Sequence, residues 1–229
     1  MGLDFLGRIL NCDTHKIALS DVHSATNLFD IGHAARARSE YTAPGYAHLF
    51  SDPHSDNHMI ERFTDKDFVF FPINERYASK IPEKAWTRYL KDLTRGPEVM
   101  TKSTCAHWSA MMVDCRGGKL QGHYFDSLHN TADDTVNSCI SSYLLVGLGM
   151  LLNKDGHRFT VCGVDIDTDT PQPWRDTANA LLDGSSACGP FVWLMAKELT
   201  QYIVECNEDG KPEAIEDLEL PPNFAARLR

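Results

Sequence analysis

The sequence predicts a single α+β domain, and three observations indicate this class. Segments with helical spacing of apolar residues and short apolar runs typical of strands both occur, but they do not alternate strictly as a doubly wound parallel sheet requires. The length of 229 residues suits one sizeable domain rather than two. A composition with 42% hydrophobic and 24% charged residues is that of an ordinary globular protein.

The first half of the chain is predicted to form a helix, a loop, a strand and a second helix. Residues 17–38 place apolar side chains at roughly helical spacing. Residues 41–57 are rich in Pro, Gly, His and Asp, which indicates a surface loop. Residues 67–73 (DFVFFPI) are a short apolar run typical of a buried strand. Pro82 suits the first turn of a helix, which we expect to end near residue 93.

The second half of the chain is predicted to contribute three strands and two apolar helices. A turn at 116–118 (Arg-Gly-Gly) joins the first two of these strands into a hairpin. The helix expected at 133–152 contains Gly-Leu-Gly at 147–149. This segment lacks the third glycine and the preceding strand of a dinucleotide-binding motif, so we interpret it as a site of close helix packing. The strands are expected at 106–115, 120–125 and 158–166, and the helices at 133–152 and from Cys188 to about Val204.

Charge and apolar patterning exclude several classes of function. The net charge of −10 gives no electrostatic support for nucleic-acid binding. The longest apolar run, Tyr143–Leu152, is about half of the ~20 residues that a membrane-spanning helix needs. Met1–Leu10 lacks a basic start followed by an apolar stretch, so no signal peptide is expected. One domain is expected over residues 1–206, and residues 207–229 read as an acidic, Pro-containing tail that is poorly ordered.

The cysteines and histidines do not form a recognisable metal-binding pattern. Seven cysteines are scattered along the chain without a CxxC pair, which is unlike a zinc ribbon or a thioredoxin motif. Buried free thiols in a reducing compartment are the simplest interpretation. His54 and His58 have ligand-like spacing but lie in a predicted loop without a further ligand set. We therefore predict no metal and no other cofactor.

Cys188 is the thiol whose local sequence favours reactivity. It follows a turn of small residues at 184–187 and begins a predicted helix, with Pro190 in the first turn. The helix dipole and free backbone N–H groups at such a position favour the thiolate, which is the nucleophilic form of cysteine. The same N–H groups can stabilise an oxyanion on a substrate carbonyl. A cysteine at the beginning of a helix can also be a packed residue without a catalytic role, so the residues around it must distinguish the two interpretations.

His107 and Asp126 supply a candidate base and its orienting partner. His107 lies near the beginning of the first hairpin strand, and Asp126 lies at the end of the second. Because the two ends of a hairpin lie side by side, these side chains are expected to reach hydrogen-bonding distance. The aspartate would then fix the tautomer of His107 and leave the other ring nitrogen for the thiol of Cys188. Either residue alone more often has a structural role.

Four segments occur in an order that resembles one peptidase family. They are Phe70–Asn74 (FFPIN), His107–Ser109 (HWS) with Val113-Asp114, Tyr124–Leu128 (YFDSL) and Gly184–Val192 (GSSACGPFV). The chain thereby resembles the ubiquitin-like-protein-specific cysteine peptidases. This group includes the SUMO proteases, the deneddylases, many bacterial effector deubiquitinases and, more distantly, the adenovirus proteinase. A fainter match, Leu19-Ser20-Asp21, lies on the family's N-terminal Leu-x-Asp motif.

The resemblance implies a papain-like fold, with a central mixed sheet flanked by helices and the nucleophile at a buried helix N-terminus. It implies cleavage after the Gly-Gly tail of ubiquitin, Nedd8 or SUMO by Cys188, His107 and Asp126. Trp108 would roof a tunnel that admits only glycines, and Asp21 and Gly189 would also contact the substrate. The family's oxyanion glutamine usually lies six or seven residues before the cysteine. Leucines stand at those positions here, and Gln172 is the candidate for that role.

Two alternative functions stay open. Some bacterial effectors of the same clan are acetyltransferases, but they need a basic site for the phosphates of coenzyme A, and no such cluster is apparent. A catalytically weak module that binds a ubiquitin-like protein is the other alternative. The expected partner in either peptidase or binding role is a ubiquitin-like modifier with its conjugates. We expect a monomer in the cytoplasm or nucleus, or in the host cytosol if the chain is a secreted effector.

Overall fold

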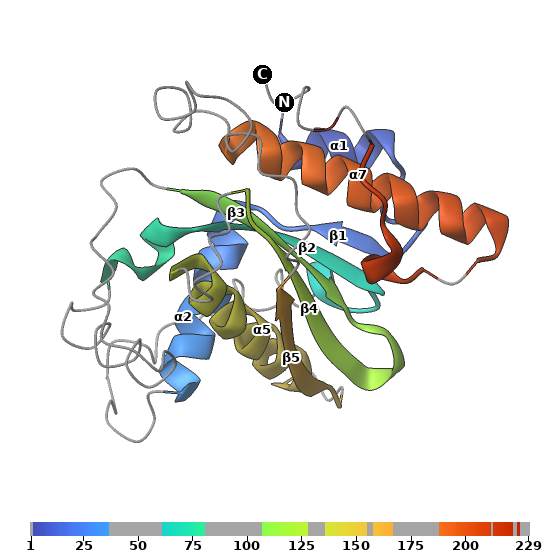
Figure 1. Ribbon diagram of the computed structural model, residues 1–229. Coiled ribbons are helices and arrows are strands. Elements are labelled where there is room, and N and C mark those ends of the chain that lie inside the picture. The colour runs from blue at the N-terminus through green and yellow to red at the C-terminus, as the bar shows by residue number, and fades with distance from the viewer. Residues whose placement is uncertain are drawn as a thin grey trace, which may run out of the picture.

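The computed structural model describes residues 2–36, 61–80, 107–127, 136–154, 158–166, 188–211, 213–221 and 224. It is an α+β structure in which helices flank a five-stranded sheet of order β1-β2-β3-β4-β5 (Figure 1). The sheet is mixed, because β1 and β2 are parallel, β2, β3 and β4 are successively antiparallel, and β5 is parallel to β4. The strands are β1 Ile17–Leu19, β2 Phe68–Asn74, β3 Trp108–Asp114, β4 Lys119–Phe125 and β5 Thr160–Ile166.

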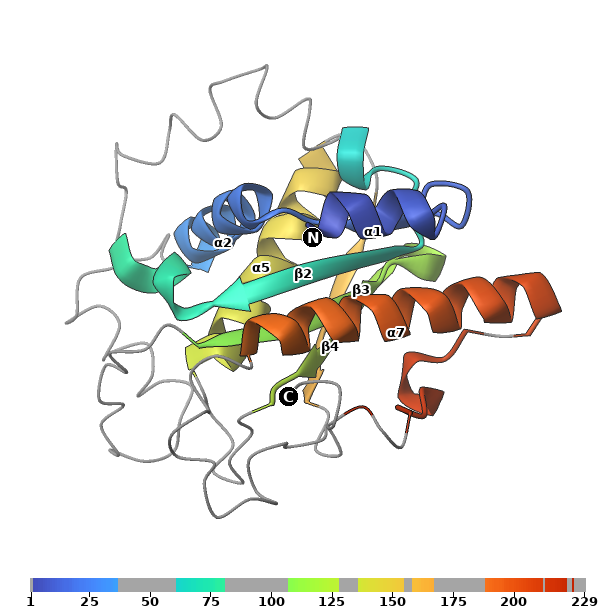
Figure 2. The ribbon, with the colours of Figure 1, turned by 90° about the horizontal axis from the view of Figure 1, so that it is seen from above.

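Helices cover both faces of the sheet. Helices α2 and α5 lie on one face, while α1 and α7 lie on the other, as Figures 1 and 2 show. Three short 3-10 helices follow β2, β3 and α7. The bounds are α1 Leu3–Ile9, α2 Val22–Arg36, α5 Val136–Lys154 and α7 Cys188–Asp209, with η3 Glu75–Lys80, η4 Arg116–Gly118 and η5 Ile215–Asp217.

Strand β2 shows why the apolar run at 67–73 becomes a central strand. All seven of its residues are buried. Successive side chains point to opposite faces of a sheet. Accordingly, Val69 and Phe71 belong to the apolar cluster under α2 and α5, while Phe68 and Phe70 belong to the cluster under α1 and α7. A strand covered on both faces has no polar face, which is why its sequence does not alternate.

The predicted strands and hairpin are confirmed, with small shifts at their ends. In the turn between β3 and β4, Gly117 has a φ of 62° and Gly118 a φ of 71°. These left-handed backbone angles are ones that glycine adopts readily. The predicted loop at 41–57, with His54 and His58, and the predicted helix at 82–93 lie outside the described residues.

The helix predicted at 17–38 is wrong at its beginning. Residues 17–19 form β1, whose three residues pair in parallel with Phe68–Phe70 of β2. Helix α2 begins only at Val22, after Asp21, whose carboxylate accepts the backbone N–H of Ser24 at 2.7 Å. That bond is an N-terminal cap, which sets the start of the helix. Periodicity missed the boundary because a three-residue apolar strand fits a helical pattern as well.

Packing continues beyond residue 206, where the domain was predicted to end. Helix α7 extends to Asp209. After it, Ile215 and Phe224 are only 3% and 1% exposed and join the core under α7. The ring of Phe224 packs edge-on against Phe191 at 6.1 Å between centroids. The described part of the tail therefore belongs to the folded domain.

Helices α2 and α5 approach each other closely at two glycines. A Cβ atom on Gly32 would lie 1.9 Å from the backbone oxygen of Tyr143, and one on Gly147 would lie 1.9 Å from that of Leu28. No side chain fits at such a distance, so glycine is required for this crossing. The close packing that the sequence predicts at residue 147 is confirmed.

Replacing Gly147 with alanine is expected to lower the free energy of unfolding by about 2–3 kcal/mol, since the added methyl group overlaps the backbone of α2. The sign of the change in the free energy of unfolding is informative, because replacing glycine with alanine in a helix with free space around it stabilises the protein by roughly 0.5–1 kcal/mol. Gly7→Ala in α1 is the matched control, since its Cβ would meet Leu19 Cδ1 at an ordinary 3.7 Å. Urea unfolding of the two variants side by side measures the difference. Equal stability would contradict the close crossing.

Candidate active site

Cys188 is the first described residue of α7 and is 5% exposed. The helix is held on the sheet by apolar side chains, among them Phe191 and Met195, which are fully buried against β3 and its neighbours. Pro190 occupies the first turn, where a missing backbone N–H costs no intrahelical hydrogen bond. The apolar face of α7 therefore determines where the thiol lies relative to the sheet.

The β3–β4 hairpin brings His107 and Asp126 together. His107 directly precedes β3 and Asp126 directly follows β4, and the two strands pair in register up to Ala110 and Phe125. The Nε2 atom of His107 lies 2.6 Å from Oδ1 of Asp126. The His107 side chain is 10% exposed and the Asp126 side chain 1%. This short, buried hydrogen bond leaves Nδ1 of the imidazole for another partner.

His107 also interacts with the thiol of Cys188. Burial alone would lower the pKa of His107, but hydrogen bonds to Asp126 and to Cys188 outweigh it and raise the pKa to about 9. Burial alone would raise the pKa of Cys188, but hydrogen bonds from His107 and from the backbone N–H groups of Trp108 and Gly189 lower it. The opposite shifts favour a thiolate beside an imidazolium, which is the reactive form of a cysteine–histidine pair.

The second carboxylate oxygen of Asp126 also accepts a hydrogen bond. The hydroxyl of Tyr124 donates to Oδ2 of Asp126 at 2.6 Å, and Tyr124 is 1% exposed. Both carboxylate oxygens are thus engaged, and the carboxylate cannot rotate without losing one of these bonds. Glu75, the first residue of η3, interacts electrostatically with both His107 and Asp126, and burial raises its pKa. The charge balance of the site therefore includes a second carboxyl group.

The other predicted contact residues have mixed outcomes. Trp108 begins β3 beside His107 and is partly buried against the core under α7. Gly189 is exposed next to Cys188, and a Cβ there would meet no atom of the described residues within 4 Å. Gln172, the candidate oxyanion residue, lies outside the described residues.

Asp21 has a structural role that the sequence did not predict. Besides capping α2, its carboxylate is paired with the guanidinium of Arg62, which also donates to the backbone oxygen of Leu19 at 2.5 Å. Burial would raise the pKa of Asp21, but the Ser24 backbone N–H and Arg62 lower it. The Asp21 side chain is nevertheless 41% exposed, so one part of it still faces solvent.

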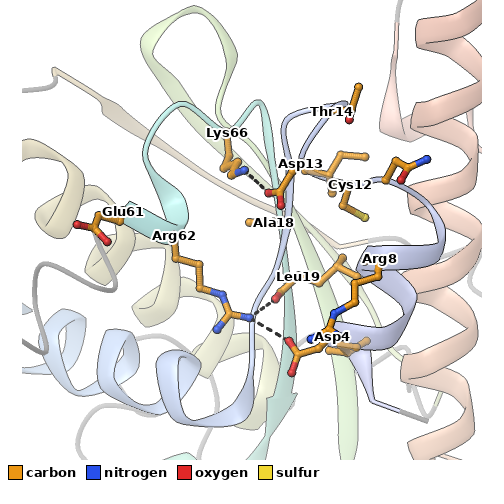
Figure 3. Close-up of a pocket in the computed structure, with 14 residues that line it drawn as sticks. Asp4, Arg8, Cys12, Asp13, Thr14, Ala18, Leu19, Glu61, Arg62 and Lys66 are labelled. Carbon is orange, nitrogen blue, oxygen red and sulfur yellow. Dashed lines mark hydrogen bonds and ion pairs between the residues drawn. The ribbon is translucent and has the colours of Figure 1, made fainter.

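A cavity of about 560 Å³ lies beside α1 and β1, and its lining does not include Cys188, His107 or Asp126 (Figure 3). Two of its cationic side chains have acidic partners. Lys66 pairs with Asp13 at 2.7 Å, and Arg62 lies 3.6 Å from Asp4. We therefore do not assign the chemistry to this cavity.

Sequence analysis did not predict the hydrogen-bonding roles of three polar residues around His107 and Asp126. Tyr124 lies two positions before Asp126, and its place on the same strand face was a usable signal. Asn74 and Asn137 both donate to the backbone oxygen of His107, at 3.1 and 3.3 Å. Asn137 comes from α5, and no local pattern connects it with His107.

Comparison with known proteins adds no relative: no protein-family model matches the chain, and no curated protein matches it with significant similarity. Any assignment of function must therefore come from the residues of the site. Within the described ranges, no helix is both long and apolar enough to cross a membrane. The six cysteines of those ranges form no disulfide.

Proposed function

We propose that this chain is a cysteine peptidase that cleaves after the Gly-Gly tail of ubiquitin or a ubiquitin-like modifier. The observation that carries the proposal is the buried hydrogen-bonded line from Asp126 through His107 to Cys188. The thiol sits at the beginning of a helix packed on a mixed sheet, and the base and aspartate directly flank two strands of that sheet. This supports a papain-like arrangement.

The reaction follows from the positions of these groups. The Cys188 thiolate attacks the scissile carbonyl, and backbone N–H groups at the start of α7 stabilise the oxyanion. His107 gives its Nδ1 proton to the leaving amine, and a thioester to Cys188 remains. His107 then takes a proton from water, which attacks the thioester and releases the carboxylate and the thiol. Asp126 holds Nε2 throughout, and Gln172 would add a side-chain donor for the oxyanion.

The substrate class rests on the motif resemblance. Four segments match the ubiquitin-like-specific peptidases in residue type and order, including His107-Trp108 and Cys188-Gly189. Gly189 has no side chain that would contact another described residue beside Cys188, which suits a narrow tail. The net charge of −10 suits the arginines in the tails of ubiquitin and its nearest relative. We propose an intracellular site of action, in cytoplasm or nucleus.

Covalent probes test the proposal directly. Purified protein is expected to form an adduct with at least one of propargyl-tailed ubiquitin, Nedd8 and SUMO, visible as a mass increase equal to the probe. Cys188→Ala should abolish the adduct, while Cys162→Ala, which removes an exposed thiol on β5, should leave it intact. The absence of any adduct from a folded wild-type chain would rule out the proposed function.

A further inference from the structure

The main chain of His107 lies just outside the sheet. Pairing between β2 and β3 ends at Asn74 and Trp108, so the strand ladder does not include His107. Its carbonyl oxygen instead accepts two side-chain amide hydrogen bonds, from Nδ2 of Asn74 at 3.1 Å and from Nδ2 of Asn137 at 3.3 Å. The two donors come from β2 and α5, which are different elements.

The orientation of both amides is determined by their surroundings. The Oδ1 atom of Asn74 accepts the backbone N–H of Arg76 at 2.9 Å, so its Nδ2 must face His107. For Asn137, the reverse orientation would place one oxygen against another. Both asparagines are buried, with 2% and 1% exposure. The contacts are therefore directional and shielded from water.

Asn137 would lower the stability of the fold if its role were purely structural. Its Oδ1 is buried and has no hydrogen-bond partner within the described part of the chain. A buried polar atom without a partner destabilises a fold, so an apolar residue would pack better here. The helix that carries Asn137 is firmly anchored, since Ile140 and Leu144 are fully buried in the core. Asn137 thus connects a rigid helix to the backbone of His107.

We infer that Asn137, together with Asn74, is a positioning residue that holds His107 in place for the Cys188 thiol. The inference rests on the proposed function, in which His107 is the base. The imidazole must meet Asp126 on one nitrogen and Cys188 on the other, so a small shift of its backbone disturbs both contacts. Two amides on one carbonyl restrict that shift.

Asn137→Leu and Asn137→Ala test the inference. Leucine keeps the volume and removes both the donor and the unpartnered oxygen, so it should fold even if alanine does not. We expect the pH profile of the rate at which iodoacetamide alkylates Cys188 to move to higher pH in both variants. The kcat on ubiquitin, Nedd8 or SUMO aminomethylcoumarin conjugates should fall by roughly tenfold to a hundredfold, with little change in KM.

Asn153→Ala is the matched control. This asparagine lies at the other end of α5 and bonds the backbone of Phe159 through both its amide atoms, at 2.7 and 3.2 Å. Its loss should leave the alkylation profile and kcat unchanged. Peptide mapping by mass spectrometry assigns the alkylation to Cys188.

The outcomes separate this inference from the proposed function. A folded Asn137→Leu protein with the wild-type alkylation profile and kcat would overturn the positioning role, while the peptidase function would stand. A shifted alkylation profile in a protein that cleaves no modifier conjugate would support the positioning role and reject the modifier substrate. The alkylation measurement needs no substrate, which makes the distinction possible.

Discussion

Asp126→Asn is expected to lower kcat by roughly three to four orders of magnitude, as loss of the orienting carboxylate does in other triads. In the folded protein the carboxylate accepts from His107 on one oxygen and from Tyr124 on the other. Asparagine keeps the shape but removes the charge, so His107 loses the interaction that raises its pKa most, and its pKa falls. The imidazolium that the thiolate needs is lost. Steady-state kinetics on the modifier conjugates measures the effect.

Asp165→Asn provides the control for this substitution. Asp165 lies on β5 and accepts a hydrogen bond from Gln121 at 2.8 Å. The kcat of the Asp165→Asn protein should equal that of the wild type. A folded Asp126→Asn protein that retains more than about a tenth of wild-type kcat would remove Asp126 from the proposed triad, since orienting carboxylates contribute far more than that.

The second large effect is the response of Cys188 to pH when His107 is replaced by alanine. In wild type, the pKa of Cys188 lies below its ordinary value, and His107 stays protonated up to about pH 9. The ion pair therefore exists above the lowered pKa of Cys188 and below the pKa of His107. Peptidase activity should decline above about pH 9, because His107 then loses the proton that the leaving amine needs.

Without His107, burial raises the pKa of Cys188, and only the backbone N–H groups of Trp108 and Gly189 oppose it. Alkylation at pH 6 should then slow by roughly a hundredfold or more, which is the difference between an activated and an ordinary thiol. His123→Ala, on β4, is the matched control and should keep the wild-type profile. An unchanged profile in His107→Ala would show that the imidazole does not activate the thiol.

Much of the fold could be predicted from local sequence. The apolar run at 67–73, the Gly-Gly turn at 117–118 and the apolar periodicity of 133–152 each have a direct structural cause, namely burial on both faces, positive φ and helical packing. Errors arose where a short segment was compatible with two structures. Residues 17–19 fit a helix by spacing, but parallel pairing with β2 makes them a strand.

The candidate site also has features that the sequence predicts and features that only the tertiary structure shows. The sequence by itself determined that a thiol begins a helix and that His107 and Asp126 lie at adjacent ends of one hairpin, because turn chemistry and strand length are local properties. Only the tertiary structure decided that Cys188 meets His107, that Asn137 reaches its carbonyl and that Asp21 binds Arg62. These contacts join residues far apart in the chain, so no local pattern encodes them. The first two depend on how α5 and α7 pack on opposite faces of the sheet.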